Sequence, residues 1–144
     1  MDGKALETEE ITEALALRVG KWRFVNKKTN KVLEEFVGRW KEQGKSIEIE
    51  GKPAEGPDYT IVVTYDPKTG VFSESYEYQD GKKMTRHGFW DWTTKTLRIE
   101  FISSDPPPEP PLPPGVKVEF LLKATGPNTI SGRFIGREGE RVMS

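Results

Sequence analysis

The sequence of 144 residues contains no cysteine and a single histidine, His87. Without cysteine the chain has no disulfide, no thiolate nucleophile and no cysteine-ligated metal. Zinc and redox metals usually take several imidazole or thiolate ligands, so a lone histidine excludes most of their sites. The sequence also lacks the Asp-rich twelve-residue loop of a calcium site. We therefore expect no metal ion or other cofactor.

The chain also lacks a dominant charge and a long apolar run. The formal net charge is −1, from 22 Lys and Arg against 23 Asp and Glu, so no basic field exists to attract nucleic acid. No run of about 18 apolar residues is present, which argues against a helical membrane span. The N-terminus lacks the basic-then-apolar order of a signal peptide. This favours the cytoplasm, although an exported chain whose signal has been removed would look the same.

The length fits a single domain spanning residues 1–144. Residues 8–19 have helical spacing, with Thr8 as a suitable cap and Gly20 as a stop. One face of this helix would carry Ile11, Ala14, Leu15 and Arg18. The remaining chain alternates in polarity and has turn signals about every 8 to 12 residues, which predicts a meandering antiparallel sheet. The expected strands are 21–26, 32–41, 46–50, 59–65, 71–78, 82–90, 96–102, 116–124, 129–137 and a short 141–143.

Two turns of this meander are alike. The stretches YDPKTGVF and WDWTTKTL both run aromatic, Asp, two residues, Thr, two residues, apolar. In each, the Asp side chain can hold the turn by accepting backbone N–H groups. Four-residue loops then place Tyr65 opposite Phe72 and Trp90 opposite Leu97, which gathers a largely aromatic face on one side of the sheet.

The hairpin at Asp80 and Gly81 determines the register between those two pairs. A two-residue turn would place Glu74 opposite His87 and would require a bulge further along the strand. A three-residue loop ending at Gly81 places Glu74 opposite Arg86 without a bulge. We favour the three-residue loop because it agrees with both neighbouring hairpins, but the sequence alone leaves both registers open.

So many strands with one apolar face would leave long open edges unless the sheet closed on itself. The predicted fold is therefore all-β, an up-and-down antiparallel barrel of about 8–10 strands with one N-terminal helix. The segment 103–115 holds most of the 11 prolines. Proline cannot donate to a strand ladder, so we expect a Pro-rich loop there.

A helix followed by Gly-x-Trp at the start of the first strand, here Gly20 and Trp22, resembles the lipocalins and their calycin relatives. With the YDPxTG turn added, the chain looks most like the uncharacterised bacterial lipocalin-like proteins, over roughly residues 8–137. The resemblance implies that Trp22 packs at the closed end of the barrel and that Arg133 or Arg137 lies against it. The missing disulfide and the Pro-rich segment depart from the usual pattern of the family.

Barrels of this size either hold one small ligand or are filled by their own side chains. A carboxylate is costly to bury without a partner, so Glu74 stands out on its aromatic strand face. Arg86 would pair with Glu74, and the pair could orient the polar head of an amphipathic ligand. The candidate ligand-binding residues are Trp22, Phe72, Glu74, Tyr76, Tyr78, Met84, Arg86 and Trp90.

Two functions follow from this sequence. The first is non-catalytic binding of a small hydrophobic or amphipathic molecule inside the barrel. The alternative is a filled barrel that acts as a structural or protein-interaction module and forms a homodimer. The exposed-looking Trp92 and the two apolar faces of the second strand, Leu33 with Val37 and Phe36 with Trp40, motivate the alternative. No nucleophile, metal or phosphate motif supports a named reaction, so we expect that the chain is not an enzyme.

Overall fold

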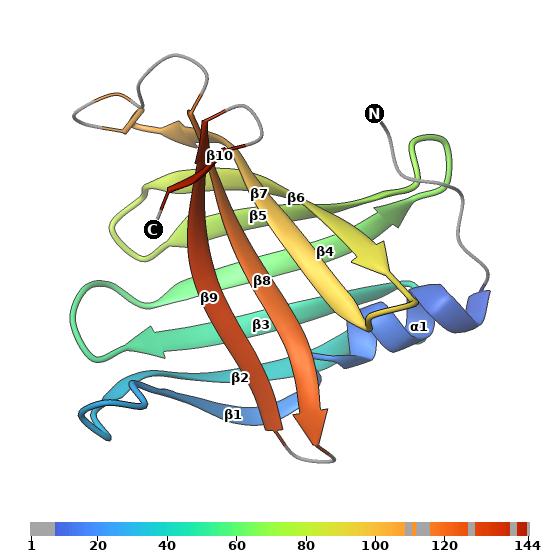
Figure 1. Cartoon of the computed structure of the whole chain (residues 1–144), viewed down its shortest axis with the longest axis horizontal. Coiled ribbons are helices and arrows are strands. Elements are labelled where there is room, and N and C mark those ends of the chain that lie inside the picture. The colour runs from blue at the N-terminus through green and yellow to red at the C-terminus, as the bar shows by residue number, and fades with distance from the viewer. Residues whose placement is uncertain (1–7, 109–110, 112–115, 127–128, 139–140, 144) are drawn as a thin grey trace.

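The computed structural model describes residues 8–108, 111, 116–126, 129–138 and 141–143, with side chains described for 8–108, 111, 117–126 and 129–133. One helix is followed by ten strands (Figure 1). Their bounds are α1 Thr8–Ala16, β1 Gly20–Val25, β2 Val32–Glu42, β3 Ser46–Pro53, β4 Tyr59–Asp66, β5 Val71–Tyr78, β6 Lys83–Asp91, β7 Thr96–Asp105, β8 Val116–Gly126, β9 Thr129–Glu138 and β10 Arg141–Met143.

The expected meander is confirmed, and every expected strand is present to within a few residues. The strands form one antiparallel sheet in the order of the chain, from β1 to β10. Three bounds differ from expectation by three residues: the ends of α1, β3 and β7. The helix ends at Ala16, where the N–H of Val19 donates to the carbonyl oxygen of Ala16 and the chain turns toward the sheet. Strand β7 extends to Asp105, so residues 103–105 pair as a strand, and 109–110 and 112–115 of the expected Pro-rich loop lie outside the described residues.

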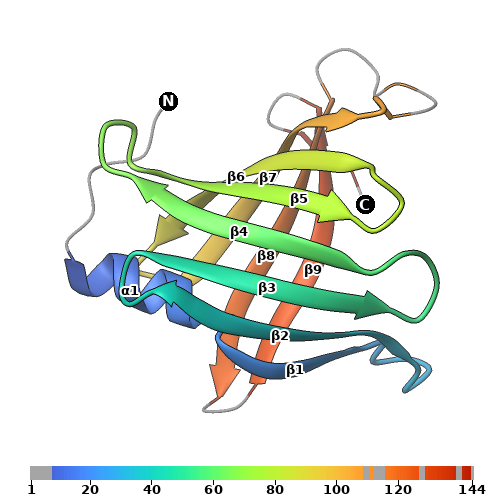
Figure 2. The same ribbon diagram turned by 180° about the vertical axis from the view of Figure 1, so that it is seen from behind.

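The sheet curls into an incomplete barrel rather than a closed one. Among the described residues, β1 and β10 are the two ends of the strand order and have no ladder between them. Strand β8 pairs with β7 only along Thr96–Glu100, and the β8–β9 hairpin then runs at a steep angle to β1–β3 (Figures 1 and 2). The hairpin therefore approaches β1 at an angle that does not suit a backbone ladder.

Side chains connect the two sides of this seam. The rings of Phe24 on β1 and Phe120 on β8 have centroids 5.8 Å apart. A Cβ atom added to Gly132 on β9 would lie 2.6 Å from both rings, closer than a carbon–carbon contact allows. The absence of a side chain at Gly132 is thus what allows β9 to approach the two phenylalanines.

The hairpin between β5 and β6 has the favoured three-residue loop. The N–H of Tyr78 donates to the carbonyl oxygen of Lys82 at 2.8 Å, and Gly81 has a φ of 91°, which suits glycine. Glu74 consequently lies opposite Arg86, not His87. The pairs Tyr65 with Phe72 and Trp90 with Leu97 are also as expected.

The hydrophobic core lies at one end of the curled sheet, where α1 covers it (Figure 2). Ala14 and Leu15 of the helix are 2% and 1% exposed and belong to this core. The helix end packs closely on β2, because a Cβ atom at Gly38 would lie only 1.9 Å from the carbonyl oxygen of Arg18. The strand residues of the core are Phe36, Ile47, Ile49, Ile61, Val63, Phe72, Tyr76, Leu97, Ile99 and Leu122.

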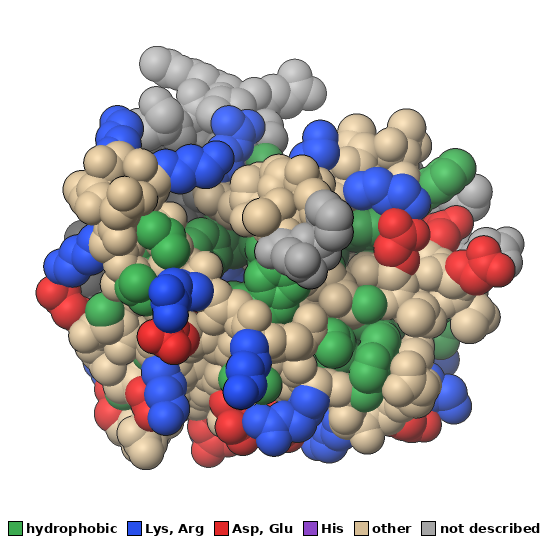
Figure 3. All heavy atoms as spheres, turned by 90° about the horizontal axis from the view of Figure 1, so that it is seen from below, with side chains coloured by type: hydrophobic (Ala, Val, Ile, Leu, Met, Phe, Trp, Pro, Cys, Tyr) green, Lys and Arg blue, Asp and Glu red, His purple; other side chains and the backbone are tan. Residues whose placement is uncertain are grey.

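On the molecular face seen in Figure 3, Lys and Arg side chains are interspersed with Asp and Glu, with hydrophobic side chains between them. Charge of one sign does not dominate that face, in keeping with the small net charge of the chain. Within the described residues, α1 has nine residues and is too short to span a bilayer as a helix.

Candidate ligand-binding cavity

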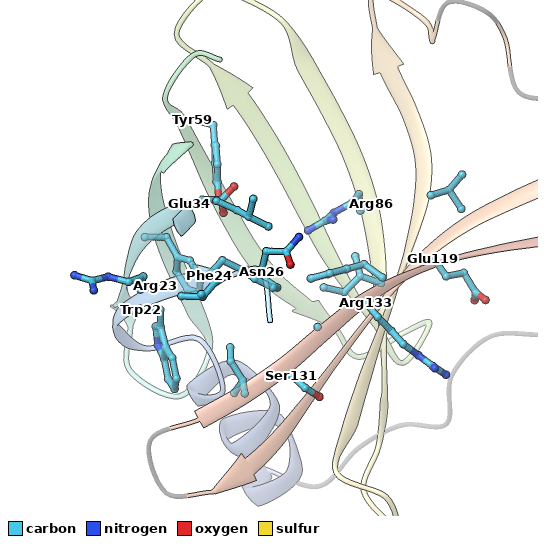
Figure 4. A pocket seen from close by; sticks show the side chains of 18 of the residues that line it. Trp22, Arg23, Phe24, Asn26, Glu34, Tyr59, Arg86, Glu119, Ser131 and Arg133 are labelled. Carbon is cyan, nitrogen blue, oxygen red and sulfur yellow. The ribbon is translucent and has the colours of Figure 1, made fainter. Parts of the chain in front are cut away.

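A cavity of about 1380 Å³ occupies the end of the curled sheet away from α1. Its lining comes from β1, β2 and β4–β9, from the β1–β2 loop and from Pro108, and Figure 4 shows side chains on opposite sides of it. Pockets for small ligands usually have volumes of about 300 to 1000 Å³. The cavity exceeds that range, and the sheet that surrounds it does not close among the described residues. The aromatic side chains on the wall are Trp22, Phe24, Phe36, Tyr59, Tyr76, Tyr78, Phe101 and Phe120.

Three tyrosines form a continuous patch on this wall. Tyr59 on β4 contacts Tyr76 and Tyr78 on β5, with ring centroids 5.5 and 5.8 Å apart, and the rings of Tyr76 and Tyr78 are 6.0 Å apart. We refer to these residues as the tyrosine cluster. Burial raises the pKa of all three phenols, so each keeps its proton at neutral pH and can donate a hydrogen bond.

Beneath the tyrosine cluster lies a buried charged triad of Arg18, Glu74 and Arg86. The alternation of β5 points Glu74 inward between Phe72 and Tyr76, and its side chain is fully buried. From the turn after α1, Arg18 donates two hydrogen bonds to the Glu74 carboxylate, at 2.5 and 3.2 Å. From β6, Nη2 of Arg86 donates to Oε1 of Glu74 at 3.1 Å. Each charge of the triad is therefore paired.

The ion pairs of the triad keep Glu74 and Arg86 ionised although both side chains are buried. Burial acts to raise the pKa of Glu74, but the Arg18 and Arg86 guanidinium groups outweigh it and hold that pKa below its usual range. Burial likewise acts to lower the pKa of Arg86, whereas Tyr76 and Glu74 raise it above its usual range. One carboxylate thus faces two guanidinium groups, and the triad carries a surplus of one positive charge.

Arg86 is the member of the triad that faces the cavity. Its guanidinium lies 4.4 Å from the centre of the Tyr76 ring, and Nη2 donates to the Tyr76 hydroxyl as well as to Glu74. Its Nε atom is buried and has no hydrogen-bond partner within the described part of the chain. The pairing of β6 with β7 shifts register beside Arg86, and such irregularities commonly redirect a side chain. Arg86 therefore has one unsatisfied buried N–H and a side chain that reaches the cavity wall.

Glu34 faces Arg86 from the opposite wall of the cavity (Figure 4). It lies on β2, and its carboxylate accepts a hydrogen bond from the Tyr59 hydroxyl. Burial raises the pKa of Glu34, while the Tyr59 hydrogen bond and the charge of Arg86 act to lower it, and burial prevails. The cavity thus contains a carboxyl group with a raised pKa, that of Glu34, across from the Arg86 guanidinium, which stays charged.

The structure brings five of the eight expected ligand-binding residues to the cavity wall. These are Trp22, Tyr76, Tyr78, Met84 and Arg86. The other three, Phe72, Glu74 and Trp90, do not line it. Phe72 is packed in the core against Tyr65, and Glu74 is sealed beneath Arg86. The half-buried Trp90 packs against the core, and its Nε1 is buried without a hydrogen-bond partner among the residues that the structure describes.

Trp22 has a role at the junction of helix and sheet. Its indole N–H donates to the carbonyl oxygen of Val19 at 3.1 Å, and its ring stacks on Phe36 with centroids 6.4 Å apart. The guanidinium of Arg133, expected beside this tryptophan, points away from it (Figure 4). The side chain of Arg137, the other candidate, lies outside the described residues.

Sequence reasoning missed Arg18, Glu34 and Tyr59 as members of the site. Helical spacing predicts Arg18 on the buried face of the helix. No local pattern in the sequence indicates that its partner is Glu74 on β5, which is 56 residues away. Glu34 shares strand parity with the buried Phe36, and the structure selects the face of Phe36 and Trp40 for the interior, with Leu33 45% exposed. That parity could have identified Glu34.

Sequence comparison does not extend this description, since no protein-family model and no curated protein matches the chain. Within the described residues, no three His, Asp or Glu side chains gather as potential metal ligands. The shape and charges of the cavity are therefore the basis for a functional proposal.

Proposed function

We propose that this chain is a lipocalin-like protein that binds a small hydrophobic or amphipathic molecule in its cavity and does not catalyse a reaction. The carrying observation is the cavity of about 1380 Å³, whose wall has eight aromatic side chains and the inward-pointing guanidinium of Arg86. Apolar walls with a few placed polar groups are typical of small-molecule sites.

The energetics of such a wall favour an apolar ligand body. Burial of apolar surface is worth roughly 25 cal/mol per Å². Removing water from the aromatic wall would therefore supply most of the affinity, while Arg86 and Tyr76 would orient a polar head through hydrogen bonds. The ligand would lie between Trp22 and the tyrosine cluster with its head toward the triad.

The lipocalin-like assignment is supported by three features together. The strands form an up-and-down antiparallel sheet, α1 covers one end of it, and Gly20-x-Trp22 begins β1. Binding without catalysis is proposed because the inward-pointing charged groups in the described part of the cavity form ion pairs and hydrogen bonds that hold one another. That arrangement suits recognition rather than proton transfer.

Fluorescence of the neutral apolar dye N-phenyl-1-naphthylamine tests the proposal. We expect the wild-type protein to enhance the emission saturably. The Met84→Trp variant should lose that enhancement, because Met84 lines the cavity and the larger indole would occupy space that the dye needs. The Lys83→Trp variant is the matched control, since Lys83 is the preceding residue and is exposed. Equal enhancement by all three proteins, or by none of them, would contradict binding inside the cavity.

A second candidate function is a structural module that self-associates. The specific observation is Trp92 in the β6–β7 turn, which is 58% exposed. The end strand β1 offers a further surface, because its outer edge has no ladder within the described residues and such an edge can pair with another chain. Sedimentation analysis over a wide concentration range distinguishes the two candidates. A dimer that the Trp92→Ser variant abolishes would favour the self-associating module. A monomer at every concentration would count against the self-associating module.

A further inference from the structure

The buried triad and the cavity wall differ in how their carboxyl groups are paired with arginine. The triad is internally paired but has one more guanidinium than carboxylate. Among the described side chains, two carboxyl groups line the cavity, Glu34 and Glu119. Glu119 forms an ion pair with Arg98 at 2.6 Å and points away from the cavity in Figure 4. Glu34 is thus the carboxyl group that shares the interior with Arg86.

In the described part of the chain, the hydrogen-bond partner of Glu34 is the Tyr59 phenol and not a lysine or arginine side chain. Its carboxylate accepts the Tyr59 hydrogen bond, and no salt bridge to Glu34 is found within the described residues. Arg86 stabilises the ionised form of Glu34 across the cavity. An anionic ligand bound at Arg86 would compete for that stabilisation and would also repel an ionised Glu34.

We infer that the cavity takes an amphipathic molecule with one negative charge, such as a carboxylate or sulfonate, whose head binds Arg86 and Tyr76 while Glu34 takes up a proton. This inference rests on the proposed function and assigns the head group and pH response of the same site. The protonated carboxyl group of Glu34 would then donate one hydrogen bond to the head group instead of repelling it.

The groups around Glu34 set the direction of its response. Ligand binding raises the pKa of Glu34 further, because an anion is added near it. Affinity for the anion is therefore greatest below the pKa of Glu34 in the free protein, and it decreases as pH rises toward the pKa in the bound state. The charged and titratable groups that line the cavity on the facing elements are Arg23 on β1, Lys27 and Lys28 in the β1–β2 loop, Tyr59 on β4, Tyr76 and Tyr78 on β5, Arg86 on β6, Glu119 on β8 and Arg133 on β9.

Three probes with the same alkyl chain and fixed head-group charge test the inference. They are dodecanesulfonate, dodecanol and dodecyltrimethylammonium, measured by displacement of N-phenyl-1-naphthylamine below their micelle concentrations. A charge-assisted hydrogen bond is worth about 1.5 to 3 kcal/mol, so we expect the sulfonate to bind roughly 10- to 100-fold more tightly than the alcohol. Its affinity should decrease with rising pH by at most about tenfold per pH unit, the limit for one linked proton. The alcohol should show little pH dependence.

Two pairs of variants assign the effect to residues. Glu34→Gln should tighten sulfonate binding at neutral pH and remove its pH dependence, while Glu35→Gln, a change at the exposed neighbour, should leave both unchanged. Arg86→Met should remove the preference for the sulfonate, while Arg18→Met should preserve it, because Arg18 does not line the cavity. Each arginine variant leaves Glu74 one guanidinium partner.

The outcomes separate this inference from the proposed function. Equal affinity for all three probes, or preference for the cation, would overturn the anionic head group while leaving the binding protein intact. A sulfonate affinity that is independent of pH in the wild type would remove the role of Glu34. Failure of every probe, the dye included, would instead reject the proposed function itself.

Discussion

Arg18, two residues beyond the end of α1, and Glu74, in the middle of β5, are joined by two hydrogen bonds across 56 residues of sequence. The shorter is 2.5 Å, and the two side chains are 6% and 0% exposed. This pair fixes the helix end to the inner face of the sheet. It also connects the helix to the cavity, because Glu74 accepts the hydrogen bond of Arg86 from its other side.

Replacing Glu74 by Gln should destabilise the protein severely. The change leaves two buried guanidinium groups facing an uncharged amide, and loss of one partner from a buried ion pair typically costs about 3 to 5 kcal/mol. Urea unfolding followed by tryptophan fluorescence would measure the loss. Glu77→Gln, at an exposed position on the same strand, should change the free energy of unfolding by less than about 0.5 kcal/mol. Similar losses in both variants would refute the structural role of the triad.

The triad also predicts how stability depends on acid. The pKa of Glu74 lies below its ordinary value of 4.5, because Arg18 and Arg86 outweigh the opposing effect of burial. Its contribution is therefore complete above that ordinary value and is lost as pH falls through the lower pKa of the folded state. We expect the wild-type free energy of unfolding to decrease below pH 4.5, and that of Glu74→Gln to decrease less over the same range. Parallel pH profiles of the two proteins would contradict this.

Glu34 should behave in the opposite sense. Its pKa is raised in the folded protein by burial, so its effect favours folding at low pH and is lost as pH rises through the folded pKa. Glu34→Gln keeps an acceptor for the Tyr59 hydroxyl and removes a partly buried charge. We therefore expect this variant to melt at a higher temperature than the wild type at pH 8, with a smaller difference near pH 4. A lower melting temperature at pH 8 would show that the carboxylate is stabilising.

Gly38→Ala should loosen the helix from the sheet. The added Cβ would lie 1.9 Å from the carbonyl oxygen of Arg18, so either the helix end or β2 must move. Overpacking of this kind usually costs about 1 to 3 kcal/mol. Gly56→Ala, which meets no neighbouring atom and has only an unfavourable φ, should cost roughly 1 kcal/mol and leave the helix in place. Amide hydrogen exchange should show faster exchange in residues 8–16 for Gly38→Ala alone.

Trp22→Phe tests the junction between helix and sheet. Phenylalanine retains an aromatic ring beside Phe36 but loses the hydrogen bond to the Val19 carbonyl, which should cost about 1 kcal/mol. Trp92→Phe, at an exposed position, removes a tryptophan without such a bond and should be nearly neutral. Chemical denaturation of both variants gives the comparison, and equal stability would mean that the indole N–H contributes little.

Local patterns in the sequence predicted the strands and the order of the hairpins, and they favoured the observed one of two registers at Gly81. Each of these depends on residues close in the chain: turn residues with a required conformation, and alternation with a period of two. The pairing of Glu74 with Arg86 followed from that register, and so did the placement of Tyr76 and Met84 on the same face. Five of the eight predicted site residues line the cavity for this reason.

The remaining parts of the site depend on contacts between distant segments. The partner of Arg18 is on β5, and the partner of Glu34 is on β4, so neither appears in a local pattern. Alternation also does not tell how far along an inward face the core ends and the cavity begins. Phe72 and Tyr76 share one face of β5, yet the first is packed in the core and the second lines the cavity.

The seam between β1 and the β8–β9 hairpin means that no backbone ladder among the described residues fixes the width of the interior. In a closed barrel, strand number and stagger fix the diameter, because every strand is tied to two neighbours. Here the contact of Phe24 with Phe120 beside Gly132 joins the two sides, and ring contacts tolerate sliding that a backbone ladder does not. The described strands therefore leave the width of this interior set by side-chain packing across the seam.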